Sequence, residues 1–167
     1  WIKEILPKTV PYSHKLNLKL VESPYLKELD KEKYHIYLRS VNKKIEIFRE
    51  ENIPLFTKME AKQQEYGGIV AKMSVEIDGE KMTMQKAALL LKNTNRAKRE
   101  EVFHKTSARR RQDEEALDNL FDELIVLRQK IAKNADFDNY RDYMFAAMGR
   151  FDYTPEDCFD FHDAIEK

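Results

Sequence analysis

The feature that most constrains the fold is a helical periodicity of apolar residues between Glu114 and Lys133. Acidic residues stand at the start of this segment and basic residues at its end, as the dipole of a helix favours. Apolar positions that recur every three or four residues lie on one face of an amphipathic helix. They form a stripe of Leu117, Leu120, Phe121, Leu124, Leu127, Arg128 and Ile131. A helix of this kind buries its stripe against other helices, so the sequence predicts a mainly α fold.

Six further segments carry helical periodicity or capping signals, at residues 31–52, 55–66, 84–91, 96–111, 139–148 and 155–167. Thr83, Asp138 and Thr154 stand where N-caps are preferred, and Gly149 is placed to end a helix. Gly67-Gly68 is expected to end the helix that Pro54 restarts, because glycine weakens helix interiors. The charged fraction of 36%, with only 4 glycines and 5 prolines, is typical of solvated helices.

Residues 69–84 change to a β-like pattern and predict the one β-hairpin. Val75 and Ile77 favour a strand, and Asp78-Gly79 is a pair that tight hairpin turns prefer. The apolar run from Ala87 to Leu91 comes directly after and is expected to be buried.

Residues 1–30 are predicted to be an extended lead-in, because Pro7, Pro11 and Pro24 disfavour long helices. Residues 31–167 are then expected to form a helical domain containing the hairpin and truncated at its C-terminal end. The reason is that the last helix still carries an apolar stripe near Lys167, formed by Cys158, Phe161, His162 and Ile165. The sequence also begins at Trp1 rather than methionine, so we expect a piece of a longer protein.

The overall charge is balanced, with 30 basic and 30 acidic residues. Nucleic acids and anionic membranes reward a basic excess, so neither is expected as a partner. No apolar stretch is long enough to predict a transmembrane helix. Cys158 is the single cysteine, which excludes an intrachain disulfide and fits a reducing compartment, so the cytoplasm is the expected location.

Catalytic motifs are missing from the sequence. The four histidines never occur as HExxH, the helical pattern that binds zinc and supplies a general base, and one cysteine cannot form a thiolate cluster. Glu-x-x-His occurs at residues 32–35 and 101–104, a spacing that di-iron helical bundles use. A di-iron bundle is therefore one alternative, although two bridging glutamates would also be needed. No catalytic, cofactor-binding or metal-binding residue is predicted in the chain.

Three other groups have a structural interpretation. His162 and Glu166 are four residues apart, but His162 belongs to the apolar stripe of the last helix. The run of arginines at 109–111 is succeeded by acids that can pair with it, which indicates a solvated helix face. Cys158 has no neighbouring base or cation to activate it and is interpreted as a buried thiol.

The order of several motifs resembles the amino-terminal half of the M3 family of zinc metallopeptidases, especially its oligoendopeptidase F-like members. The motifs are Gln-Gln-Glu-Tyr-Gly-Gly at 63–68, the hairpin at 75–80, the helix opened by Thr83, residues 95–103, residues 139–143 and residues 149–154. The resemblance spans about residues 31–167, and all its motifs are structural rather than catalytic.

This resemblance implies a mostly helical, two-lobed enzyme that admits short peptides to a deep channel. In the family, HExxH and a downstream glutamate bind one zinc ion, and none of these residues matches a position here. The chain is thus expected to be a catalytically silent amino-terminal segment, with oligopeptides and the remaining part of the same protein as its partners. The alternative from another class is a self-standing helical interaction module that binds a partner through Cys158, Phe161 and Ile165.

Overall fold

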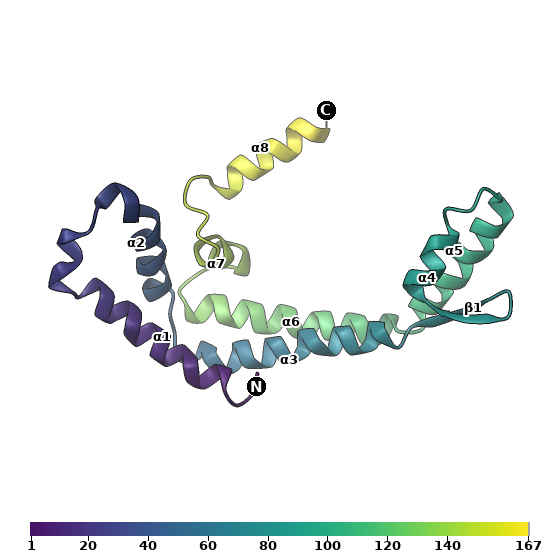
Figure 1. Cartoon of the computed structure of the whole chain (residues 1–167), viewed down its shortest axis with the longest axis horizontal. Coiled ribbons are helices and arrows are strands. Elements are labelled where there is room, and N and C mark those ends of the chain that lie inside the picture. Colours follow the sequence, from purple (N-terminus) through teal and green to yellow (C-terminus); the bar gives the residue numbers. More distant parts are fainter. Residues whose placement is uncertain (167) are drawn as a thin grey trace. The chain divides into compact units, whose positions relative to one another are not determined.

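The computed structural model describes residues 1–166 and shows there eight α-helices, one short 3-10 helix and one hairpin (Figure 1). In chain order the elements are α1 (Leu6–Val21), η1 (Pro24–Glu28), α2 (Lys31–Glu46), α3 (Asn52–Ala71), β1 (Ser74–Ile77), β2 (Glu80–Thr83), α4 (Met84–Leu90), α5 (Arg96–Arg111), α6 (Glu114–Asn134), α7 (Tyr140–Ala147) and α8 (Pro155–Glu166). The predicted mainly α fold with one β-hairpin is confirmed.

The chain forms two compact units. The central unit comprises Glu60–Ile125, and the split unit comprises Trp1–Met59 with the residues from Val126 onward. Each unit has its own buried cluster of apolar side chains, and the two clusters share no residue. The units do not follow the boundary at residue 30 that the sequence suggested.

The core of the split unit lies where the end of α6 meets α7 and the start of α3. Its buried residues are Ile47, Ile131, Ala132, Ala135 and Tyr143, with Leu55, Phe56 and Met59 packed beside them. The stripe predicted for α6 supplies part of this core, since Ile131 is fully buried. Phe121 of the same stripe is 55% exposed, so the predicted face is only partly covered.

Asn52 is a buried polar residue that joins two helices of the split unit. It is only 1% exposed. Its side-chain Nδ2 donates to the carbonyl of Ile131 at 3.0 Å, and its Oδ1 accepts from Nδ2 of Asn134 at 2.7 Å. The Ile131 carbonyl is among the last four of α6, which have no partner within the helix. Asn52 therefore caps the end of α6 from the start of α3.

The predicted extended lead-in is wrong, because α1 is a helix. Pro7 lies in its first turn, where a missing N–H costs nothing, and Pro11 removes only one hydrogen bond. All but Leu20 of its half-buried positions follow a helical period: Pro7, Val10, Pro11, His14, Asn17, Leu18 and Val21. The ring of His14 stacks on Phe48, just beyond α2, with 3.7 Å between ring centroids. The favourable free energy of packing this face of α1 is larger than the free-energy cost of Pro11 within the helix.

Two predicted helix boundaries also need correction. The helix expected at 31–52 ends at Glu46, and the chain turns before α3 starts at Asn52. Gly67-Gly68 does not break α3, which continues to Ala71. Each glycine costs about 1 kcal/mol relative to alanine in a helix. Burial of the apolar residues further along, up to the 6% exposed Met73, favours continuing the helix.

The predicted hairpin is confirmed in the central unit. Ser74 pairs with Thr83 and Ile77 with Glu80 in an antiparallel register. Asp78 and Gly79 both have positive φ, +54° and +77°, as a type I′ turn requires. Val75, Ile77 and Met82 point to one face and pack with Ala87 and Val102. That cluster is the core of the central unit.

The expected burial of the whole run from Ala87 to Leu91 is wrong. Thr83 caps α4 as predicted, accepting from the N–H of Lys86, but only Ala87 is buried. Leu89 is 64% exposed. Only one face of a short helix can meet the hairpin, so Leu90 is partly buried against the same cluster, while Ala88, Leu89 and Leu91 remain exposed.

Helices α7 and α8 agree closely with their predicted signals. The N-cap of α7 is Asn139 rather than Asp138, because the Asn139 side chain accepts from the N–H of Asp142. Gly149 has φ +66°, and Arg150 N–H bonds the carbonyl of Phe145, which is a Schellman ending. For α8, Thr154 and Asp157 form the predicted reciprocal capping box.

Candidate functional site

A groove of about 350 Å³ in the central unit is the candidate functional site. It is lined by the end of α3, the residue before β1, helix α4, and the adjoining ends of α5 and α6. The lining side chains are Tyr66, Val70, Met73, Met84, Gln85, Ala88, Arg110 and Leu117. This size is at the lower end of small-molecule sites in proteins.

The groove combines an apolar lining with a single cation. Arg110 is exposed and makes no ion pair or side-chain hydrogen bond with any other residue in 1–166. Its neighbour Arg109, in contrast, pairs with Asp113. The prediction that the arginine run pairs with the acids after it therefore holds for Arg109 alone. A guanidinium beside an apolar surface can bind a ligand that carries both an anion and an apolar group.

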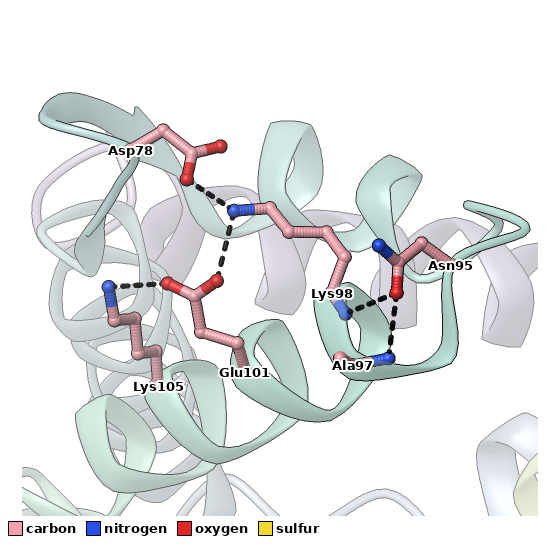
Figure 2. Close-up of polar contacts among 6 residues, drawn as sticks. All are labelled: Asp78, Asn95, Ala97, Lys98, Glu101 and Lys105. Atoms are coloured by element: carbon pink, nitrogen blue, oxygen red, sulfur yellow. Dashed lines mark hydrogen bonds and ion pairs between the residues drawn. The ribbon is translucent and has the colours of Figure 1, made fainter.

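A network of charged side chains fixes the hairpin next to α5 (Figure 2). Lys98 Nζ donates to Asp78 in the hairpin turn at 2.5 Å and to Glu101 at 3.0 Å. Glu101 also accepts from Lys105, at 2.8 Å. The same helix is capped by Asn95, whose side chain accepts from the N–H groups of Ala97 and Lys98. The network thus ties the tip of the hairpin to the first two turns of α5.

These contacts shift the pKa values of the groups involved. Hydrogen bonds from Lys105 and then Lys98 lower the pKa of Glu101 below its usual 4.5. Hydrogen bonds to Asp78 and then Glu101 raise the pKa of Lys98 above its usual 10.5. Both shifts favour the charged form, so the native hairpin contacts need Glu101 ionised and Lys98 protonated.

The stability of the hairpin is therefore expected to depend on pH at both extremes. The contribution of Glu101 is complete above pH 4.5 and is lost as the pH falls through its lowered folded-state pKa. The contribution of Lys98 is complete below pH 10.5 and is lost as the pH rises through its raised pKa. Urea titrations followed by the NMR methyl signals of Val75 and Ile77 in β1, at about pH 3, 7 and 11, measure this dependence. Lys98→Met should reduce this pH dependence of stability. Lys92→Met, which replaces an exposed lysine, should leave it unchanged.

A second hollow, of about 270 Å³, lies in the split unit between α2 and the end of α7. Its lining includes Lys44, Gly149 and Phe151. Beside it, Arg39 makes a bidentate pair with Asp152, with N···O distances of 2.9 and 3.1 Å, and its guanidinium lies 4.4 Å from the centre of the Phe151 ring. The pair lowers the pKa of Asp152. These contacts hold the segment between α7 and α8 against α2.

The two Glu-x-x-His pairs do not form a metal site. Glu101 is engaged by two lysines, and the side chain of His104 is 70% exposed. Glu32 and His35 belong to the other unit. Among residues 1–166 no group of three or more His, Cys, Asp and Glu side chains is arranged to hold a metal ion. The residues of this range therefore do not fit a zinc or di-iron centre.

The apolar stripe at the end of the chain is exposed. Phe161 is 64% exposed and Ile165 is 68% exposed, while Cys158 is partly buried. Within the described residues this stripe is therefore largely an exposed apolar patch. The interpretation of Cys158 as a buried thiol is only partly correct.

The groove residues were not predicted as a site. Tyr66, Met73, Met84 and Leu117 lie on elements that are far apart in sequence, and each has the pattern of an ordinary apolar position. The sequence itself gives no local signal, because each arginine of the run at 109–111 has an acid four residues later. The pairing becomes unequal only in the structure. Asp113 is four residues after Arg109 and pairs with it, which leaves Arg110 available.

None of the helices within residues 1–166 combines the length and the hydropathy that crossing a membrane requires.

Comparison with known proteins gives matches to peptidases. Residues 89–167 match the model of peptidase family M3. No curated protein matches the sequence significantly. Among solved structures, a putative oligoendopeptidase F from Bacillus anthracis str. Ames has a TM-score of 0.89 at 23% identity, covering 97% of this chain and 30% of that one. PZ peptidase A, solved with an inhibitor, has a TM-score of 0.89 at 21% identity, covering 98% and 29%.

A second structure of a putative oligoendopeptidase F has a TM-score of 0.84 at 23% identity, covering 92% of this chain and 27% of that one. The chain spans less than a third of the length of these structures. The matched family model and the resemblance drawn from the sequence motifs agree. Residues 89–167 thus resemble peptidase family M3, and nearly the whole chain shares the fold of these solved structures.

Proposed function

We propose that this chain is the amino-terminal helical segment of a zinc metalloendopeptidase that hydrolyses peptide bonds in short peptides. The observation that carries the proposal is the fold, which the chain shares over 97% of its length with a protein described as an oligoendopeptidase F. The match of residues 89–167 to the M3 model supports it independently of the structure.

In this proposal the chain itself is catalytically silent. Residues 1–166 do not fit a zinc site. The HExxH motif and the downstream glutamate that the family resemblance implies match no position in the sequence. We therefore assign zinc binding and activation of water to the rest of the protein, and to this chain a share in the wall around the substrate. Its partners are then oligopeptides and the remainder of the same protein, in the cytoplasm.

A second candidate function is a helical interaction module. The observation that favours it is the exposed stripe of α8, because Phe161 is 64% exposed and Ile165 68% exposed. Exposed apolar patches of this kind mark interaction surfaces. In the peptidase proposal the same stripe is covered by the rest of the enzyme, so the stripe alone does not separate the two functions.

The two functions predict different continuations of the reading frame after Lys167. The peptidase proposal predicts that the frame continues into HExxH, and that the longer polypeptide cleaves internally quenched oligopeptides but leaves folded proteins intact. Replacing the glutamate of HExxH with glutamine should reduce the rate by more than about a hundredfold, because the general base is removed. A stop codon directly after Lys167, or a longer polypeptide without peptidase activity, would favour the interaction module.

A further inference from the structure

The groove of the central unit has an apolar lining that can adapt its shape. Met73 and Met84 form part of this lining, with Val70 and Leu117 beside them. Methionine side chains are flexible and polarisable, so they fit apolar groups of differing shape. A lining of this kind binds a class of apolar side chains rather than one residue type.

The positive charge at the groove indicates which polar group the ligand carries. Arg110 is the groove's cation and has no acidic partner among residues 1–166, whereas Arg109 one residue earlier is paired with Asp113. An unpaired guanidinium binds a carboxylate through two parallel hydrogen bonds. The complementary ligand therefore carries an apolar group and a carboxylate close together.

Two polar side chains favour a peptide over a fatty acid as this ligand. Tyr66 and Gln85 line the groove, and neither makes a side-chain hydrogen bond within residues 1–166. A phenol and a carboxamide can donate to and accept from the amide groups of a peptide. A fatty acid offers no such groups, so both side chains would lose contact with water without gaining a partner.

We propose that this groove binds the carboxyl-terminal end of an oligopeptide whose last side chain is apolar. Arg110 pairs with the terminal carboxylate, the methionines receive the last side chain, and Gln85 and Tyr66 bond the peptide backbone. This inference rests on the proposed function, because it takes oligopeptides to be the molecules that the protein meets. It adds a preference for a free carboxyl terminus, which the fold alone does not give.

Binding of a fluorescein-labelled pentapeptide that ends in leucine tests the proposal, with the fluorescence anisotropy of the peptide, titrated with the 167-residue chain, as the readout. The free-acid peptide is expected to bind about tenfold more tightly than its carboxyl-terminal amide, as loss of one charge-assisted pair predicts. Arg110→Ala should remove this difference. Arg111→Ala, the matched control at the next exposed arginine, should change the affinity less than about twofold. Decanoate should compete poorly.

A second measurement uses the longer polypeptide, in which Arg110→Ala should raise KM about tenfold for free-acid peptides and leave KM for amidated peptides unchanged.

Three binding results would overturn the groove assignment. They are equal binding of the acid and the amide, equal effects of the Arg110 and Arg111 variants, and decanoate binding as tight as that of the peptide. The groove assignment would also be overturned if residues of the longer protein itself filled the groove. In that case Arg110→Ala would leave KM unchanged. If the longer polypeptide hydrolyses peptides with a KM that does not depend on Arg110, the groove assignment is wrong and the peptidase proposal stands. If peptides bind in a way that depends on Arg110 but the longer polypeptide hydrolyses none of them, the peptidase proposal is wrong and the groove assignment stands.

Discussion

Replacing Asn52 with leucine is expected to lower the free energy of unfolding of the split unit by about 3 kcal/mol. Leucine has a similar volume but cannot donate to the carbonyl of Ile131 or accept from Asn134. Because Asn52 is 1% exposed, water cannot replace the lost partner of that carbonyl. A buried polar group without a partner costs about 1 to 3 kcal/mol, and two are affected here.

Urea denaturation followed by circular dichroism measures this effect. Asn119→Leu is the matched control, because it makes the same substitution at an exposed position of α6. We expect the control to change the free energy of unfolding by less than about 0.5 kcal/mol. Equal effects of the two variants would show that Asn52 does not cap α6.

Ile77→Ala is expected to destabilise the central unit by about 3 kcal/mol and to leave the split unit nearly unchanged. Ile77 is fully buried at the centre of the cluster with Val102 and Ala87. Removing its outer carbon atoms leaves a cavity that the short hairpin cannot fill by moving. The effect should stay local because the two buried clusters share no residue.

Hydrogen exchange with peptide-level resolution separates these outcomes. Peptides from residues 60–125 should lose protection in Ile77→Ala, and peptides from α7 should keep it. Leu89→Ala removes a comparable side chain from an exposed position of α4 and serves as the control. Loss of protection across the whole chain in Ile77→Ala would show that the two units unfold together.

Most helices and the hairpin could be predicted from sequence because their signals are local. The caps Thr83, Asn95 and Thr154 bond N–H groups within three residues, and the Asp78-Gly79 turn needs only its own positive φ angles. The failures arise where tertiary packing outweighs a local preference. Helix α1 forms in spite of Pro11, and α3 continues through Gly67-Gly68.

The candidate site was harder to predict than the fold. The groove is assembled from four helices and the residue before β1, so no spacing in the sequence marks it. The expected burial of Leu89 was wrong for the same reason, since burial depends on which face of a helix a neighbouring element covers. The sequence indicated a resemblance to the M3 family because several structural motifs occur in the same order, even though each motif alone is unspecific.

We propose above all that this chain is a segment of a peptidase whose chemistry depends on the rest of the protein. The most direct test compares the purified 167-residue chain with the longer polypeptide, at equal concentration with added zinc, on one internally quenched oligopeptide. We expect cleavage by the longer polypeptide that phenanthroline abolishes, and none by the shorter chain. Phenanthroline-sensitive turnover by the pure 167-residue chain would contradict this account.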